Sequence, residues 1–486
     1  MTAKMYLDLG IKLVKKGDIE NATTAFCTAI KLDQSYAPAY NNLGLIFKNT
    51  ERLGEAEACF CRAIELDSKN WHAYNNLGLV FLDVGDLQQA EACFRKATEL
   101  YVNSPAIYNN LGIALEEQYQ LFEAEKAYER AVQLKPDFPE AHHNLGRILR
   151  MTRRFAEAEQ HFFRAVELRP GYSEAKYSLA IFYLLCGEFG RGWREYEQSR
   201  LTSYRYRQLD IPHWRGEDLT GKHILLCWEH GFGDTIQFAR YAQMVEQLAS
   251  KTSLWVQKPL ERLLSTLFPS ITVLAGECPL QARYDYVCSL LSLPAIFNTC
   301  SETIPQPVPY APVKCAASAF HRETSEKMNG NRVGVVWAGN PKHANDAQRS
   351  IPFTVFQNLF RVPGVSWVSL QVGPRAEDLM AASCNISDSS SELADFLDTA
   401  ELLEDINLVI TVDTAVAHVA GSMGKETWVL LPYDPDWRWQ LDREDSPWYP
   451  AVRLFRQRKP GEWQEVIERV RMALQQKAAG ISTHGR

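Results

Sequence analysis

A single acid, Asp234, follows a glycine turn in the stretch WEHGFGDTIQF, residues 228–238. An apolar run, ILLCW, precedes the turn and an amphipathic stretch, TIQFARYAQMVEQLA, follows it, so Asp234 is expected where a strand passes into a helix. Its carboxylate could hold the helix end, help to bind a phosphate or take a proton from a substrate. Gly231 and Gly233 would let a substrate approach the backbone closely.

Phosphate binding fits this turn poorly. The sequence has no GxxxxGK[ST] motif, GFGD lacks the third glycine of GxGxxG, and an anion would meet a carboxylate here. A helix cap is the main alternative to catalysis, because Asp234 followed three residues later by Gln237 has the spacing of a capping box. Capping and proton abstraction therefore both stay open, and both hold if the cap lies in a cleft.

A second group of polar residues lies in NLVITVDTAVAHVAGSMGKETWVLLP, residues 407–432. The pattern predicts a strand that ends at Asp413 and a helix that starts at once with Thr414. Backbone N–H groups and the helix dipole would then form a seat for a diphosphate. His418 lies one turn into this helix, where contact with a ligand and packing against the sheet are both open.

The elements that must position these residues alternate through the second half of the chain. The segments HILLCW, TIQFARYAQMVEQLA, SLWVQ, PLERLLSTLF and ITVLAG follow one another, which predicts βαβ units in a parallel sheet. A stretch with four prolines, residues 303–313, interrupts the series, and a second one begins at RVGVVWAGN, residues 332–340. Two such sheets predict two lobes with a cleft beyond the carboxyl ends of their strands.

The first two hundred residues repeat with a period of 34, marked by YNNLG at 40–44, 74–78 and 108–112 and by HHNLG at 142–146. Three repeat positions keep their residue type: Gly10, Gly44, Gly78, Gly112, Gly146 and then Ala180; Ala22, Ala56, Ala90, Ala124 and Ala158; and Phe26, Phe60, Phe94, Tyr128 and Phe162. This period resembles the tetratricopeptide repeat, a helix pair in which small residues let the two helices approach closely. Five clear units and a degenerate sixth are expected.

Asparagine occupies one position in four consecutive units: Asn42, Asn76, Asn110 and Asn144. On the first helix of each unit this position should face the groove, where primary amides can donate to and accept from a peptide backbone. The row resembles the asparagine ladder of protein O-GlcNAc transferases, which implies that these residues bind a polypeptide acceptor. Duplication of the repeat alone would also explain the recurrence.

The segments WEHGFGDTIQFARY, WAGNPKHANDAQRSIP and DTAVAH resemble bacterial heptosyltransferases, which are glycosyltransferases of the GT-B fold. The resemblance implies that Asp234 deprotonates the acceptor hydroxyl, because an alcohol is a weak nucleophile until its proton is removed. It also implies that Asp413 and Thr414 hold the sugar donor, with His418 as a further donor contact.

The segment WAGNPKHANDAQRSIP, residues 337–352, resembles the loop of that family that carries a cation against the donor phosphates. The family usually has Lys there; in this chain Arg349 stands at the matching place, and an Arg would hold a diphosphate bidentately. Asn340 and His343 either contact the phosphates or shape the turn around Pro341.

Almost the whole chain resembles bacterial proteins that fuse tetratricopeptide repeats to a heptosyltransferase-like domain. The resemblance implies an α-solenoid at residues 1–204, followed by an α/β GT-B fold with two Rossmann-like lobes at 205–318 and 319–486. It implies a glycosyltransferase that moves a sugar from a nucleotide-diphosphate sugar to a protein acceptor held by the repeats, with inversion and without metal. Flagellin or another surface protein is an acceptor that suits bacterial relatives.

Two alternatives stay open. The replacement of the usual Lys by Arg349 leaves room for a non-catalytic repeat scaffold with a degenerate transferase domain. The acceptor could also be lipid-linked or a saccharide, with the repeats serving assembly; the asparagine row and the absence of a basic amphipathic helix argue against this alternative. A homo-oligomer is compatible with either hypothesis.

Composition limits the partners and the metal chemistry. The net charge of −7 argues against indiscriminate binding to nucleic acid or anionic membrane. No signal peptide and no run of about 18 apolar residues is visible, so a cytoplasmic protein without a membrane span is expected. The eleven cysteines form no CxxC pair, and several follow the 34-residue period, which indicates core residues in a reducing compartment.

Residues 434–450 offer a further motif, because Asp434-Pro-Asp436 has the form of the DxD metal motif. That motif belongs to the other major glycosyltransferase fold, so a structural role is expected, with no metal and no cofactor besides the donor substrate. In the neighbouring aromatic run, Trp437 and Trp439 are expected to pack the C-terminal lobe, with the acceptor side as the alternative.

Overall fold

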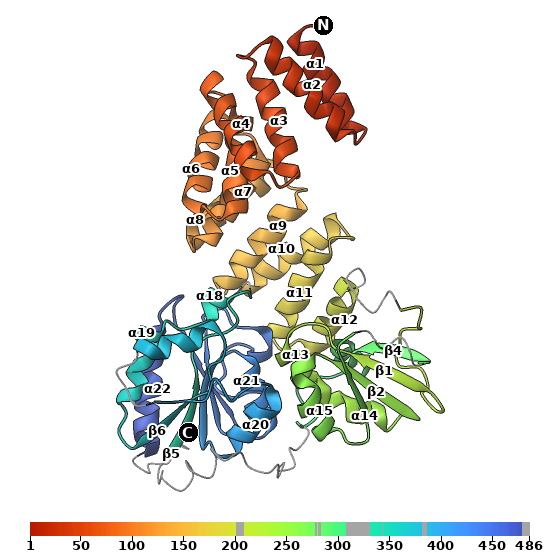
Figure 1. Ribbon diagram of the computed structural model, residues 1–486, viewed down its shortest axis with the longest axis vertical. Helices are drawn as coiled ribbons and strands as arrows, with labels where there is room; N and C mark the ends of the chain where they lie inside the picture. Colours follow the sequence, from red (N-terminus) through yellow and green to blue (C-terminus); the bar gives the residue numbers. More distant parts are fainter. Residues whose placement is uncertain are drawn as a thin grey trace. The chain divides into compact units, whose positions relative to one another are not determined.

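The computed structural model, shown in Figure 1, describes residues 1–200, 209–277, 279, 283–307, 331–343, 345–381 and 386–478. The chain divides into two compact units, residues 1–179 and residues 180–486. In the part of the chain that the structure describes, the first unit contains helices alone, whereas the second combines helices with two parallel sheets.

The first unit is a series of helix pairs, and each pair is one 34-residue repeat. Short polar turns separate the helices, and several helices are capped by an acid: the carboxylate of Asp18, for example, accepts a hydrogen bond from the backbone N–H of Asn21. The helices are α1 (Ala3–Lys15), α2 (Ile19–Leu32), α3 (Ala37–Asn49), α4 (Leu53–Leu66), α5 (Trp71–Val84), α6 (Leu87–Leu100), α7 (Pro105–Glu117), α8 (Leu121–Leu134), α9 (Pro139–Met151) and α10 (Phe155–Leu168). The predicted helical repeat is confirmed.

The repeated glycines lie where the two helices of a pair are closest. A Cβ atom on Gly78 would stand 2.7 Å from the ring of Phe94, and the other four glycines face their own aromatic partner at 2.4 to 2.8 Å. The aromatic rings are fully buried; Phe94 is 0% exposed. Larger side chains than glycine would therefore push the pair apart, as the sequence predicted.

The turn inside each repeat also has a fixed backbone conformation. One position is left-handed in every unit, with a φ of 79° at Gly17, 80° at Gly85 and 81° at Gly187. The same position carries Glu51, Tyr119 and Arg153 in the other units, with φ near 60°. Side chains other than glycine pay a steric cost in this region, so three of the turns are strained relative to the glycine turns.

Two further helices, α11 (Ser173–Leu185) and α12 (Phe189–Arg200), continue the repeat pattern, but the first compact unit ends at Leu179, before the predicted solenoid end at residue 204. The reason is packing. The ring of Trp193 in α12 lies 5.3 Å from that of Trp437 and 6.3 Å from that of Phe238, inside the core of the second unit. The predicted lobe boundary at residues 318 and 319 lies outside the described residues.

The first sheet is parallel, and in the described residues its strand order is β3-β2-β1-β4. Its strands are short and mostly buried, as expected for strands covered on both faces. The elements are β1 (His223–Cys227), α13 (Phe232–Phe238), η2 (Ala239–Tyr241), α14 (Ala242–Glu246), β2 (Lys251–Val256), η3 (Lys258–Leu260), α15 (Glu261–Leu267), β3 (Thr272–Ala275), β4 (Tyr286–Ser289), η4 (Leu290–Ser292) and α16 (Leu293–Ile296), where η marks a 3-10 helix.

The second sheet is also parallel, with the order β10-β9-β8-β5-β6-β7 in the described residues. Strands β8 and β9 are buried along their whole length. The elements are β5 (Asn331–Val336), α18 (Asp346–Arg349), α19 (Phe353–Phe356), η5 (Gln357–Arg361), β6 (Val365–Ser369), η6 (Pro374–Ala381), β7 (Ile386–Asp388), α20 (Phe396–Glu404), β8 (Leu408–Val412), α21 (Ala415–Ser422), β9 (Thr427–Leu431), η7 (Trp437–Trp439), β10 (Val452–Arg456) and α22 (Trp463–Ala478).

One apolar core joins the two sheets, because Leu226 of β1 and Val409 of β8 belong to the same cluster of buried side chains. A separate core lies between β5 and helix α22 and includes Val335 and Val466. The predicted parallel α/β region is therefore present. Among the residues that the structure describes, no helix combines the length and the apolar character that crossing a membrane requires.

Candidate functional site

Asp234 lies near the start of helix α13, at the carboxyl edge of the first sheet. The helix begins at Phe232 with Gly231 as its N-cap, so Asp234 is the third helical residue and not the cap itself. Its Oδ2 accepts a hydrogen bond from the backbone N–H of Gly231 at 2.9 Å. The predicted capping box with Gln237 is therefore wrong in its register, because the N-cap is Gly231 and Asp234 is the third residue of the helix. Gln237 is fully buried.

Gly233 is needed because a side chain of the other lobe occupies the space beside it. A Cβ atom on Gly233 would stand 2.7 Å from Cδ2 of His418 in α21. The imidazole is 5% exposed, its Nδ1 lies 2.8 Å from the Tyr449 hydroxyl, and it stacks on Trp439 with ring centroids 5.5 Å apart. Burial lowers the pKa of His418 to about 3, so the ring is neutral. This geometry fits the packing alternative for His418.

The carboxylate of Asp234 forms an ion pair with Arg438, a residue that the sequence hypothesis left unassigned. Nη2 of Arg438 donates to Oδ1 of Asp234, while Nη1 donates to Oδ1 of Asp436 at 2.8 Å. The Arg438 and Asp234 side chains are 12% and 19% exposed, so their ion pair is shielded from water, whereas the Asp436 side chain is 37% exposed. Burial opposes the charge, yet the two carboxylates outweigh it and leave the pKa of Arg438 raised.

Arg438 is positioned by the turn after β9. The side chain of Asp436 caps the 3-10 helix η7 by accepting from the backbone N–H of Arg438 at 3.0 Å, and Trp437 and Trp439 are buried on either side, which agrees with their predicted packing role. The guanidinium carbon lies 4.4 Å from the ring centroid of Trp437. Asp436 thus has a structural role, as predicted, but it also pairs with a cation at the sheet edge.

Asp413 follows β8 and Thr414 is the N-cap of α21, as the sequence predicted. Burial and, after it, the charge of Asp436 raise the pKa of Asp413 to about 6 against the opposing charge of Arg349. The Thr414 hydroxyl makes no cap hydrogen bond and lies 3.1 Å from that of Thr411. An acid that can hold a proton near neutral pH therefore stands beside two arginines.

Arg349 ends the short helix α18 in the loop after β5. Its Nε lies 3.6 Å from Oδ1 of Asp346 and, among the described residues, has no hydrogen-bond partner although it is buried. Gly339 makes room for it, because a Cβ there would meet Nη2 of Arg349 at 2.6 Å. The Asn340 side chain accepts from the backbone N–H of Lys342 at 3.0 Å and is exposed, so it shapes the turn around Pro341.

These residues form one polar cluster drawn from both sheets. Burial lowers the pKa of His343, and the same imidazole also feels the charges of Arg349, Asp436 and Asp234. The cluster lies at the carboxyl ends of parallel strands, where ligands of such sheets bind. It combines the carboxylate of Asp234 from one lobe with two guanidinium groups from the other, which are themselves accompanied by Asp346, Asp413 and Asp436.

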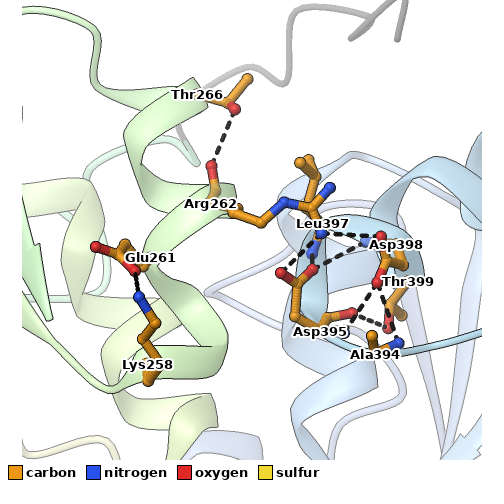
Figure 2. A network of polar contacts seen from close by, with 9 residues as sticks. All are labelled: Lys258, Glu261, Arg262, Thr266, Ala394, Asp395, Leu397, Asp398 and Thr399. Atoms are coloured by element: carbon orange, nitrogen blue, oxygen red, sulfur yellow. Dashed lines mark hydrogen bonds and ion pairs between the residues drawn. The ribbon is translucent and has the colours of Figure 1, made fainter. Parts of the chain in front are cut away.

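Further contacts hold the two lobes together away from this cluster, as Figure 2 shows. Arg262 of α15 donates to Asp395 at 2.9 Å and to Asp398 at 3.0 Å, and these two acids form the capping box of α20. Phe232 of α13 packs against Phe396 of α20, with ring centroids 5.2 Å apart.

The asparagine row makes hydrogen bonds between neighbouring repeats, which the sequence did not predict. The Nδ2 of Asn76 donates to Oδ1 of Asn41 at 3.1 Å, so an amide of one repeat bonds an amide of the repeat before it. The same bond recurs from Asn110 to Asn75 at 2.9 Å and from Asn144 to Asn109 at 3.0 Å. At the corresponding positions of the next repeat, the imidazole Nε2 of His143 lies 2.8 Å from the hydroxyl of Ser178. Asn42 instead donates to the carbonyl of Pro38 at 2.8 Å.

The row therefore connects neighbouring repeats by hydrogen bonds, and each residue of the predicted set uses its amide N–H group as a donor within the first unit. Asn144 is 8% exposed, whereas Asn42, Asn76 and Asn110 are partly exposed. Contact with a peptide would have to use the remaining polar atoms of these three side chains. The row lies in the first unit and is not part of the polar cluster of the second.

Comparison with known proteins covers the chain unevenly. The family profile described as "Cilia and flagella-associated protein 70 C-terminal domain" matches residues 1–179. Protein FlbA of Caulobacter vibrioides is 28% identical over 327 residues, which cover 62% of this chain and 54% of FlbA. This chain thus spans about half the length of that relative. Because the aligned stretch is longer than the first unit, the similarity extends into the second.

Two solved structures are similar to part of this chain. The crystal structure of YrrB, described as a TPR protein with an unusual peptide-binding site, is 26% identical, covers 36% of this chain and 91% of its own, and has a TM-score of 0.32. PilF of Pseudomonas aeruginosa is 18% identical and covers 43% and 91%, with a TM-score of 0.37. The helix pairs and the profile match identify residues 1–179 as tetratricopeptide-type repeats.

Proposed function

We propose that the second unit is a GT-B glycosyltransferase that moves a sugar from a nucleotide-diphosphate sugar to a polypeptide held by the repeats. One observation carries the proposal: Asp234, from the edge of the first sheet, meets the cations of the second sheet in a single polar cluster. A transferase of this type needs a base on the acceptor side and positive charge on the diphosphate side, a few ångströms apart.

The reaction would proceed in one displacement. The carboxylate of Asp234 takes the proton of the acceptor hydroxyl while the hydroxyl oxygen forms a bond to the anomeric carbon. The bond between that carbon and the diphosphate oxygen breaks, and the nucleotide diphosphate leaves with the electron pair. Arg349, whose Nε has no hydrogen-bond partner among the described residues, and the N–H groups at the start of α21 would stabilise the charge that develops on the leaving group.

A non-catalytic scaffold is the second candidate, and one observation favours it. Both carboxylate oxygens of Asp234 are engaged in this structure, Oδ1 by Arg438 and Oδ2 by the Gly231 N–H. A carboxylate with these contacts can have a purely structural role, in which it connects the two lobes through Arg438 and takes no proton. The first unit would then carry the function by binding a polypeptide.

The test is donor binding and hydrolysis by the full chain with a panel of nucleotide-sugars. We expect one donor to bind, Arg349→Ala to weaken binding by about tenfold or more, and Asp234→Ala to keep binding while turnover falls about a hundredfold or more. Arg453→Gln is the matched control, because Arg453 pairs with Glu444 at an exposed site outside the cluster. Absence of binding of every donor at millimolar concentration would leave the scaffold candidate.

A further inference from the structure

We infer that Arg438 is a ligand of the donor diphosphate that rests on Asp234 until the donor binds, so that donor binding frees the base. This inference rests on the proposed function of the same cluster. It assigns a role to Arg438, whose side chain forms an ion pair with the other lobe and which no motif of the sequence marks.

The geometry gives Arg438 two carboxylate partners, and these differ in origin. Asp436 lies two positions before it, in the same turn, and also caps the helix from which Arg438 projects. Asp234 belongs to the other lobe and is 204 positions away in the sequence. The contact with Asp436 is therefore built into the turn, whereas the contact with Asp234 can be exchanged without unfolding either element.

The ion pair also determines what Asp234 can do. Its Oδ2 accepts a hydrogen bond from the Gly231 N–H at 2.9 Å, and its Oδ1 accepts one from Arg438. Each oxygen keeps a further lone pair, so Arg438 competes with an acceptor hydroxyl for Oδ1. Release of the guanidinium removes this competition.

A diphosphate would compete for Arg438 in a cluster that also holds the carboxyl groups of Asp346, Asp413 and Asp436. A guanidinium binds phosphate oxygens bidentately, and a diphosphate brings more negative charge than one carboxylate. Arg349 is the cation in the same cluster that has a buried N–H without a partner among the described residues. A diphosphate held by Arg349 would therefore compete with Asp234 for Arg438, and the enzyme would bind donor before it activates acceptor.

The test is a thermodynamic cycle with inorganic pyrophosphate as the probe, measured by calorimetry on the full chain. We expect Arg438→Gln to weaken pyrophosphate binding about tenfold. Asp234→Asn should strengthen it about tenfold, because the competitor for Arg438 is gone. In the double variant this gain should disappear, since Arg438 is no longer there to be released.

Controls separate this role from a purely structural one. Unfolding midpoints establish that each variant is folded, and Arg453→Gln should bind pyrophosphate like the unmodified chain. If Arg438→Gln does not fold, the double substitution Arg438→Gln and Asp436→Asn removes the charge together with its partner in the turn and replaces it in the cycle.

The outcomes distinguish the inference from the proposed function. If pyrophosphate binds and needs Arg349, but Asp234→Asn changes nothing, the inference is overturned and the transferase proposal stands. If Asp234→Asn raises pyrophosphate affinity equally with and without Arg438, the inference is also overturned, because the gain would then come from the loss of a negative charge near the anion and not from the release of Arg438. The predicted coupling without turnover of any nucleotide-sugar supports the exchange at Arg438 and refutes the transferase. No pyrophosphate binding by any variant overturns both.

Discussion

Arg438 and Asp234 form an ion pair that joins the edges of two different parallel sheets. Their side chains are 12% and 19% exposed, so solvent screens the pair only weakly. A second inter-lobe contact, from Arg262 to Asp395 and Asp398, has an arginine that is 52% exposed. The two contacts therefore differ in their expected response to salt, although both connect the same lobes.

Arg262→Ala should destabilise the second unit by less than about 1 kcal/mol, because exposed ion pairs contribute little. The loss should shrink further when the salt concentration is raised from about 0.05 M to about 0.5 M. Tryptophan fluorescence during urea unfolding is a suitable measurement, since all of the 12 tryptophans except Trp71 lie in the second unit. A salt-independent loss would show that Arg262 acts through packing of its stem.

Asp413→Asn should stabilise the second unit at pH above about 6. The pKa of Asp413 is raised to about 6 chiefly by burial, against 3.8 in the unfolded chain, so the folded state holds its proton longer. Stability from this group is complete below about pH 4 and is lost as pH rises to about 6. The variant should therefore exceed the unmodified chain by roughly 1–3 kcal/mol at pH 7.5 and match it near pH 4.

Asp445→Asn is the matched control for this pH series. A hydrogen bond from Arg443 is the main cause that lowers the pKa of Asp445, which is the opposite direction. This variant should lose stability relative to the unmodified chain as pH rises, so a parallel response of the two variants would contradict the assignment.

Glu51→Gly should stabilise the first unit by about 0.5–1 kcal/mol. Glu51 has a φ of 60° at the repeat position where Gly85 has a φ of 80°, and glycine adopts this conformation without steric cost. Helix loss followed by circular dichroism during urea unfolding measures the effect. The reciprocal substitution, Gly85→Ala, should cost a similar amount, and a gain there would be inconsistent with backbone strain.

Gly78→Ala should destabilise the first unit by roughly 1–3 kcal/mol, because the added Cβ would stand 2.7 Å from the buried ring of Phe94. Gly54 provides the control: it lies in α4 with no atom within 4 Å of the added Cβ, so Gly54→Ala should gain up to about 1 kcal/mol in helix propensity. Equal effects of the two substitutions, again from urea unfolding, would rule out close packing as the reason for the repeated glycine.

His143→Asn should remove part of the acid sensitivity of the repeats. Burial lowers the pKa of His143 to about 4 from 6.5, with Arg147 adding to the shift, so its contribution is complete above about pH 6.5 and is lost as pH falls toward 4. The difference is worth roughly 3 kcal/mol. Hydrogen exchange in α9 and α11 between pH 7 and pH 4.5 would reveal it, and an unchanged pH profile would argue against this histidine.

Much of the repeat architecture could be predicted because its determinants are local. A period of 34 residues places Gly78 and Phe94 in one helix pair, and the contact between them follows from the period alone. The end of the solenoid could not be placed in the same way. Tyr196 keeps the aromatic position of the repeat, whereas Trp193 stands where the four preceding units have a glutamate. Both side chains lie in the core of the second unit.

The site was predicted in part. Asp413 and Thr414 stand where a strand-to-helix pattern placed them, since that pattern is contiguous in the sequence. The cap at Asp234 was wrong by three residues, because the two preceding glycines, Gly231 and Gly233, make more than one helix start possible. Arg438 was left out because its partner is 204 positions away. The sequence feature that could have marked Arg438 is its place as a cation between two tryptophans in the segment after a buried strand.

Each rung of the amide row joins residues 35 positions apart, and successive rungs are 34 positions apart. After deletion or duplication of one whole 34-residue segment, the repeats on either side of it could therefore form the same amide hydrogen bond with each other. The same holds for the glycine contacts within the pairs. The number of repeats can thus change between descendants of this protein in steps of one, without any change in the sequence of the second unit.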